Sequence, residues 1–274
     1  NFMAPHVHNE LGLLYRDLKQ TDQEIFHFQR ANALAPTWGL VLTNLGATYQ
    51  RQSQYELAKE MYLQALSRDS SLALAHYNLG VLYEENAEPE AAVASYQKTL
   101  EADSSFADAY YNLASVYADD EALFPQALEL LGRFQELEPD QAYGYDLETY
   151  LHIQMGNQEA ALSSTLAALE ADSTSFYALQ NAVLIYSTQS EYEKALPVLN
   201  TMIRHYPEQK VGYRDKAYCL LQLGRNEAAT ETIRQLLSTG YDDYEALKND
   251  SGLSALQSEP GYQALMQQYF PDRE

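Results

Sequence analysis

Cysteine is nearly absent from this sequence. Cys219 is the only one in 274 residues, which excludes an intrachain disulfide and any metal site built from several cysteines. We expect it to be a single buried thiol. Low cysteine content fits the cytoplasm and the bacterial periplasm equally well, so composition does not assign the chain to a compartment.

Positive charge is scarce as well. The sequence has 17 Lys and Arg residues against 39 Asp and Glu residues, which gives a formal net charge of −22. Proteins bind nucleic acids and anionic membrane surfaces through Lys and Arg, so neither is an expected partner. No stretch approaches the roughly 20 consecutive apolar residues that cross a bilayer. We therefore expect a soluble protein without direct membrane insertion.

The motifs of familiar catalytic and cofactor sites are missing too. There is no Gly-rich phosphate loop, no His-Glu-x-x-His, no nucleophile elbow and no calcium loop. His6, His8 and His27 could form only a weak metal site, so we expect no enzymatic activity, no cofactor and no metal ion. The sequence begins at Asn1 without an initiator Met or a secretory signal, which suggests a processed chain or an excised piece.

What the sequence has in abundance is a repeated pattern. Three dipeptides lie 34 residues apart and each is followed by a tyrosine: Leu45-Gly46 by Tyr49, Leu79-Gly80 by Tyr83, and Leu113-Ala114 by Tyr117. The apolar residues in each period have helical spacing. This period predicts two short amphipathic helices per repeat, which must stack on neighbouring copies to bury their apolar faces.

The pattern resembles the tetratricopeptide repeat from residue 5 to about residue 240. In the third repeat, Leu79-Gly80, Tyr83, Ala92 and Tyr96 match the family's Leu-Gly, Tyr, Ala and aromatic positions. The resemblance implies an all-α fold, an α-solenoid in the form of a right-handed superhelix of about seven helix-turn-helix repeats with C-terminal capping helices. The repeats are expected at about 5–38, 39–72, 73–106, 107–141, 142–175, 176–209 and 210–240, forming a solenoid over residues 1–240, and the capping helices at 241–274.

Three places depart from the family pattern. Glu24 occupies the small-residue position of the first repeat, and the fourth repeat has one extra residue in its turn, within residues 119–125. In the fifth repeat, Glu148 and Thr149 replace Leu-Gly. Residues 244–265 resemble the terminal segment of many bacterial tetratricopeptide arrays, and we expect them to cover the last exposed apolar face.

A recurring asparagine marks the candidate binding surface. In the resembling family the first helix of each repeat lines the concave groove, and one place in that helix holds Asn44, Asn78, Asn112 and Asn181. A side-chain amide can donate to and accept from a peptide backbone, and Tyr77 and Tyr111, each one residue before an asparagine, would add contact surface. The alternative is structural: the asparagines are solvated or tie adjacent helices, and the tyrosines pack between repeats.

The charges are unevenly distributed along the chain. Between residues 69 and 193 there are twenty-two acidic residues and only two cations, Lys98 and Arg133. We expect Glu84, Glu85, Asp108 and Asp119 to lie on or near the groove and to steer a basic partner; a solvated face is the alternative. From Lys194 to Arg225 the balance reverses, with six cations and two acids. That segment could dock an acidic partner or an acidic segment of another copy; the alternative is pairing with nearby charges on its own helices.

These features predict a non-catalytic scaffold for protein–protein interactions, which binds a peptide or an extended protein segment in its groove. The acidic residues favour a basic or polar partner. The alternative function is a structural or self-associating spacer within a larger assembly or a longer chain.

Overall fold

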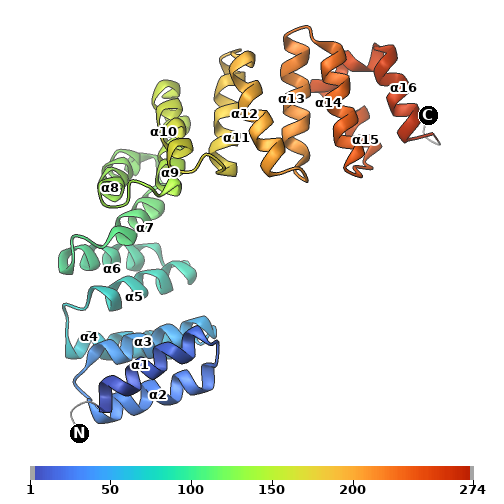
Figure 1. Ribbon diagram of the computed structural model, residues 1–274. Coiled ribbons are helices and arrows are strands. Elements are labelled where there is room, and N and C mark those ends of the chain that lie inside the picture. The colour runs from blue at the N-terminus through green and yellow to red at the C-terminus, as the bar shows by residue number, and fades with distance from the viewer. Residues whose placement is uncertain (1–3, 272–274) are drawn as a thin grey trace. The chain divides into compact units, whose positions relative to one another are not determined.

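The computed structural model describes residues 4–271, and its regular structure is entirely helical there, with no strand among the described residues. The chain forms two compact units, and the boundary between them in the sequence lies between Glu138 and Pro139 (Figure 1). The first unit holds four helix pairs: α1 (Ala4–Asp17) with α2 (Thr21–Leu34), α3 (Gly39–Arg51) with α4 (Tyr55–Arg68), α5 (Ala73–Glu85) with α6 (Pro89–Ala102), and α7 (Ala107–Tyr117) with α8 (Phe124–Leu137).

The second unit continues the same pairing and ends in a different way. Its pairs are α9 (Ala142–Gln154) with α10 (Gln158–Ala171), α11 (Phe176–Thr188) with α12 (Tyr192–His205), and α13 (Lys210–Gln222) with α14 (Asn226–Ser238). A closing segment follows, made of α15 (Tyr244–Lys248), the 3-10 helix η2 (Ser251–Ser258) and α16 (Pro260–Tyr269). The predicted all-α, helical-repeat solenoid fold is confirmed.

Within the first three pairs, a glycine of the first helix makes room for an aromatic ring of the second. A Cβ atom added to Gly46 would lie 2.6 Å from Cε1 of Tyr62, and one added to Gly80 would lie 2.5 Å from Cε1 of Tyr96. Gly12 stands in the same relation to Phe28, at 2.5 Å. The aromatic rings are almost fully buried, so these close helix crossings depend on the missing side chain.

In the later pairs both positions of this contact hold residues of other sizes. The buried residues at the corresponding places are Ala114 and Leu131, Thr149 and Thr165, Val183 and Leu199, and Ala217 and Ile233. In each of these pairs the residue on the first helix is larger than glycine and the residue on the second helix is smaller than Tyr or Phe. In the fifth pair the hydroxyls of Thr149 and Thr165 lie 3.3 Å apart in a buried hydrogen bond, so Thr149 is compatible with the fold because a small polar partner replaces the aromatic ring.

The turn inside most pairs contains one residue with a left-handed backbone. Lys19, Ser53, Ala87 and Ser190 have φ between 57° and 59°, and Gly156 and Gly224 have φ of 73° and 70°. Only glycine adopts this conformation without strain. The fourth pair differs, because its turn is one residue longer and contains the short helix η1 (Glu121–Leu123). The Asp120 side chain caps this helix by accepting the Ala122 N–H at 2.9 Å.

Some acidic residues hold the turns between pairs. The Asp69 carboxylate accepts the amide and hydroxyl of Ser71, at 2.9 and 2.6 Å, and Asp103 and Asp172 do the same with Ser105 and Thr174. These hydrogen bonds lower the pKa of each carboxyl below its usual value, and the bonds from the hydroxyls have the largest effect. Part of the chain's acidity therefore has a local structural role.

Glu24 is buried in the small-residue position of the first repeat, where the other repeats have alanine. Its side chain is 2% exposed and forms an ion pair with Arg51, and its Oε1 accepts the Thr48 hydroxyl at 2.7 Å. A buried carboxylate is tolerated when it is paired in this way. The departure from the repeat pattern is thus matched by two polar partners on α3.

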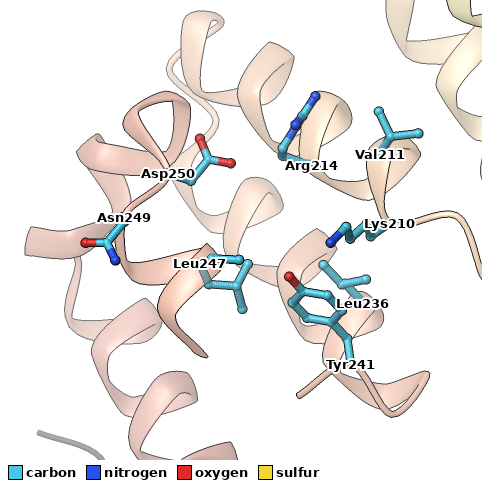
Figure 2. A pocket seen from close by; sticks show the side chains of 9 residues that line it. Lys210, Val211, Arg214, Leu236, Tyr241, Leu247, Asn249 and Asp250 are labelled. Carbon is cyan, nitrogen blue, oxygen red and sulfur yellow. The ribbon is translucent and has the colours of Figure 1, made fainter. Parts of the chain in front are cut away.

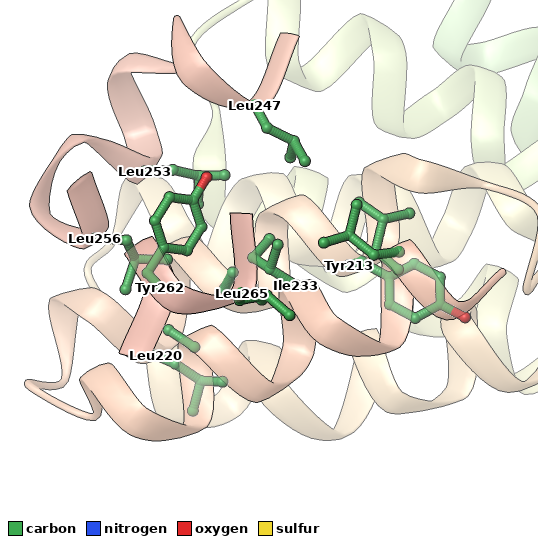
Figure 3. Close-up of a cluster of buried hydrophobic side chains, with 12 residues drawn as sticks. Tyr213, Leu220, Ile233, Leu247, Leu253, Leu256, Tyr262 and Leu265 are labelled. Atoms are coloured by element: carbon green, nitrogen blue, oxygen red, sulfur yellow. The ribbon is translucent and has the colours of Figure 1, made fainter. Parts of the chain in front are cut away.

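The closing segment covers the apolar face of the last helix pair. Leu247, Leu253, Leu256, Tyr262 and Leu265 pack with buried residues of α13 and α14 in one cluster (Figure 3). The predicted buried thiol also lies on α13: Cys219 is free and fully buried, and burial raises the pKa of its thiol.

The glycine–aromatic contact gives a direct stability test. We expect Gly46→Ala to lower the free energy of unfolding by about 2 kcal/mol, because the new methyl group overlaps the Tyr62 ring. In a Tyr62→Leu background, where the ring is gone, the same change should cost less than about 0.5 kcal/mol. Urea unfolding of the four proteins measures this coupling. An equal cost in both backgrounds would contradict the size-matching account.

Candidate functional site

Two of the four predicted ladder asparagines form hydrogen bonds to the preceding repeat. The Asn44 amide donates to Oδ1 of Asn9, which lies on α1 and is almost fully buried, at 3.1 Å. The Asn112 amide donates to the Tyr77 hydroxyl at 3.1 Å and to the Tyr96 hydroxyl at 3.4 Å. In each case a first helix is joined to the first helix before it, and the half-buried amides keep further hydrogen-bonding capacity.

Asn78 and Asn181 are half-buried and form no side-chain hydrogen bond within residues 4–271. Tyr77 packs against Phe106, with 4.8 Å between ring centroids, and burial, with a smaller effect from Asp108, raises the pKa of its phenol. The Tyr111 ring lies 5.6 Å from that of Phe134. Both tyrosines therefore make contacts inside the first compact unit while remaining partly accessible.

The four predicted steering residues are all exposed. Glu84 accepts the hydroxyl of the buried Tyr96 at 2.7 Å, and Glu85 accepts the Gln50 amide at 3.0 Å. Asp108 lies in the first turn of α7, and Asp119 lies in the turn before η1. Two of the four carboxylates thus bond to neighbouring side chains, and all four contribute negative charge to the surface of the first unit.

The second unit contains a cavity between two neighbouring first helices. It has a volume of about 360 Å³ and lies between α11 and α13. Gln180, Asn181, Val183, Leu184 and Ser187 line it from α11, and Val211, Arg214, Asp215 and Tyr218 line it from α13. Leu184 is 50% exposed, and neither Gln180 nor Asn181 has a side-chain hydrogen bond in the described part of the chain. The cavity thus combines apolar surface with two available amides.

A second cavity lies between α13, α14 and the closing segment. It has a volume of about 390 Å³ and is lined by Lys210, Val211, Arg214, Leu236, Tyr241, Ala246, Leu247, Asn249 and Asp250 (Figure 2). Val211 and Arg214 line both cavities. We call the two together the first-helix trough; it crosses α11 and α13 and ends at α15 and η2.

More exposed apolar side chains lie on the first helices of the same unit. Tyr143 and Tyr150 on α9 are 38% and 46% exposed, and Tyr177 on α11 is 70% exposed. Exposed aromatic residues gathered on one set of helices are characteristic of interaction surfaces. The aromatic residues that we predicted for binding, Tyr77 and Tyr111, are more enclosed than these.

Asp146 on α9 is a carboxylate with an unusual environment. Its Oδ1 is buried without a hydrogen-bond partner, while its Oδ2 accepts the Ser175 hydroxyl at 3.4 Å. Burial, reinforced by Asp172 and opposed by the Ser175 hydrogen bond, raises the pKa of Asp146 to about 6. The charged form is therefore disfavoured in the folded protein.

Sequence reasoning identified Asn181 but missed the rest of the trough. The Lys210–Arg214 pair was visible as part of the basic segment, and its spacing of four residues already places both on one helix face. The wall formed by Tyr241, Asn249 and Asp250 was not foreseeable, because the closing segment has no repeat register to align it with α13.

Within the described residues no helix has the length and apolar character needed to cross a membrane. Residues 4–271 also contain no group of three or more His, Cys, Asp or Glu side chains that could hold a metal ion. The ring nitrogens Nδ1 of His8 and His27 lie 2.9 Å apart, as a hydrogen bond in which one ring donates.

The asparagine contacts lead to a first prediction for this surface. Asn44→Ala and Asn112→Ala should each lower the free energy of unfolding by about 1 kcal/mol, the usual contribution of such hydrogen bonds. Asn78→Ala is the matched control, because it makes the same chemical change without removing a bond; it should cost less than about 0.3 kcal/mol. Urea unfolding midpoints check this, and equal losses for all three variants would contradict a bridging role.

Asp146 leads to a pH-dependent prediction. Because its pKa is raised from 3.8 to about 6 in the fold, its contribution to stability is present below about pH 4 and is lost as the pH rises through 6. Asp146→Asn should therefore be more stable than the original at pH 7 by about 1 kcal/mol, a value discounted for partial solvent screening. At pH 4 the two should be equal. Thermal melts across this range test it, and a constant difference would refute it.

Comparison with known proteins supports the repeat assignment. Family models described as tetratricopeptide repeat match residues 5–37, 43–105 and 188–250, which together make up more than half of the chain. Two curated proteins match over shorter stretches. Anaphase-promoting complex subunit 3 of Schizosaccharomyces pombe is 34% identical over 67 residues, covering 24% of this chain and 10% of its own. Uncharacterized protein ycf37 of Guillardia theta is 30% identical over 64 residues, covering 23% and 36%.

Several solved structures share the fold over most of their length. YrrB, described as a TPR protein with an unusual peptide-binding site, is 26% identical, with a TM-score of 0.57, and covers 69% of this chain and 97% of its own. A tetratricopeptide repeat protein from Parabacteroides merdae is 17% identical, with a TM-score of 0.60 and coverage of 93% and 98%. The C-terminal part of a repeat protein from Cytophaga hutchinsonii is 14% identical, with a TM-score of 0.69 and coverage of 88% and 98%.

The fold and these matches point to a protein-interaction scaffold, and repeat proteins of this kind are generally non-catalytic. Because the repeat period, the helix pairs and the family matches agree along the sequence, the chain belongs to the tetratricopeptide repeat family.

Proposed function

We propose that this chain is a non-catalytic scaffold that binds an extended peptide or protein segment in the first-helix trough of its second unit. The observation that carries the proposal is that two cavities, of about 360 and 390 Å³, share Val211 and Arg214 and so lie next to each other. Both lie within the size range of ligand sites in proteins. A ligand that crosses from α11 to the closing segment must be elongated, and an extended peptide has that shape.

The lining of the trough provides the contacts that an extended peptide needs. The amides of Gln180 and Asn181 are available to donate to peptide carbonyls and accept from peptide N–H groups. Leu184 and Val211 offer apolar surface for side chains, and Leu184 is 50% exposed, so its burial by a ligand would be favourable. In this proposal Asn181 keeps the binding role expected from the ladder and acts together with residues that the ladder did not include.

The first unit supplies a second and more acidic part of the proposed binding surface. Asn44, Asn78 and Asn112, with Tyr77 and Tyr111, would hold a segment there, and Glu84, Glu85, Asp108 and Asp119 would favour a basic or polar one through electrostatic attraction. The asparagines that already bridge repeats would act through their remaining donor or acceptor. YrrB, which is described as having a peptide-binding site, supports a peptide as the class of partner.

Self-association is a second candidate function. Arg204, Lys210 and Lys216 form no ion pair within the described residues, and the chain offers a long acidic segment that they could contact in another copy. Such a contact would weaken at high salt, because exposed charges are screened over a few ångströms. A monomer at low ionic strength would exclude this function.

A selection experiment tests peptide binding. Peptides selected from a random phage library on the immobilised full chain are synthesised with a fluorescent label, and their binding is followed by anisotropy. The trough variant Asn181→Ala/Leu184→Ser should bind at least about tenfold more weakly. The control Leu166→Ser removes an equally exposed leucine from α10, outside the trough, and should leave binding unchanged. Failure to select any peptide, or equal binding to all three proteins, would contradict the proposal.

A further inference from the structure

The cavity at the closing end of the trough contains an unusual pair of charges for this chain. Lys210 and Arg214 lie four residues apart on α13 and both line the cavity. The whole sequence carries a formal charge of −22, so two cations facing one cavity stand out from their surroundings. Figure 2 shows Lys210 reaching toward Tyr241 on one side of the cavity, with Asn249 and Asp250 on the other.

The charge of Lys210 is not neutralised inside the protein. Its ammonium lies 5.4 Å from the centroid of the Tyr241 ring, a favourable contact that leaves the charge in place, and it forms no ion pair within residues 4–271. Arg214 forms an ion pair with Asp215 through Nε and one terminal nitrogen, at 3.0 and 2.9 Å. Both Arg214 and Lys210 are exposed, so their remaining donors can reach a ligand.

Two acidic residues near the cavity accept hydrogen bonds from backbone amides. Oδ1 of Asp250 accepts the Gly252 N–H at 2.8 Å, at the start of η2. Oδ1 of Asp243 accepts the Ala246 N–H at 3.0 Å, at the start of α15. Carboxylates at these positions are stabilised by backbone amides. They are therefore held by the closing segment rather than paired with Lys210.

The floor of the same cavity is apolar. Leu236 and Leu247 are 3% and 4% exposed, and the Tyr241 ring lies beside them (Figure 2). A ligand that fills the cavity must therefore place an apolar group against this floor while its charged group meets the cations at the rim. A fully polar acidic segment would make no apolar contact with Leu236, Leu247 or Tyr241, and a basic one would meet Lys210 and Arg214 with the wrong sign.

We propose that this cavity selects protein segments in which a glutamate or aspartate side chain is next to an apolar residue. The proposal rests on peptide binding in the trough and specifies what one end of the trough recognises. The apolar residue packs on Leu236, Leu247 and Tyr241, and the carboxylate accepts from Lys210 and Arg214. The preference differs from the basic or polar preference of the first unit, so the two units of the chain would recognise segments of opposite charge.

The phage selection tests this specificity. Among peptides selected on the original chain, we expect acidic residues next to Leu, Ile, Val or Phe to be enriched about threefold or more over the unselected library. Selection on Lys210→Met/Arg214→Met should lose this enrichment. The control Lys194→Met/Arg204→Met removes two cations from the neighbouring helix α12, outside both cavities, and should retain it.

Synthetic peptides then give a quantitative test. One enriched peptide, acetylated and amidated so that its ends carry no charge, is compared with its Glu→Gln counterpart. The Glu form should bind the original chain about tenfold more tightly, and the difference should vanish in Lys210→Met/Arg214→Met. Equal binding of the two forms, with both lost in Asn181→Ala/Leu184→Ser, would overturn the acidic preference and leave peptide binding intact. A selection that yields no peptide at all would overturn both.

Discussion

The contact between one residue of each first helix and one residue of its second helix, matched to each other in size, underlies the whole structure. Where the first residue is glycine, as at Gly46 and Gly80, the ring of Tyr62 or Tyr96 fills the space that a Cβ atom would occupy. Where the residue on the first helix is larger than glycine, its partner on the second helix is smaller than an aromatic residue. Interiors of proteins are packed too tightly to tolerate a mismatch, so each repeat keeps its helix crossing by changing the two residues together.

This packing decides which surfaces remain for binding. The apolar face between paired helices is buried by packing within each repeat and against neighbouring repeats, and one face of the first helices is left accessible. In the second unit that face carries Tyr143, Tyr150, Tyr177 and Leu184, each at least 38% exposed. The trough across α11 and α13 follows the same face and stops at the closing segment, which covers the end of the array and also provides the wall of the last cavity.

Much of the fold could be predicted from sequence because it follows from a period. The 34-residue spacing and the Leu-Gly, Tyr and Ala positions are enough to place the helix pairs, even in the fifth repeat, where Thr149 finds a matching Thr165. The binding surface was harder to predict. Hydrogen bonds such as Asn112 to Tyr77 depend on the distance between repeats, and the cavity beside Lys210 depends on Tyr241 and Asp250, which lie outside the repeat register.

Part of the chain's negative charge has a structural role. Several acidic residues hold turns, as Asp69 and Asp103 do, and others begin the helices of the closing segment, as Asp243 and Asp250 do.

Hydrogen–deuterium exchange of the intact chain, with and without a bound peptide, tests the central claim most directly. The account predicts slower exchange in α11, α13 and residues 241–250 and no change in α10 and α12. Protection confined to the second helices would contradict it.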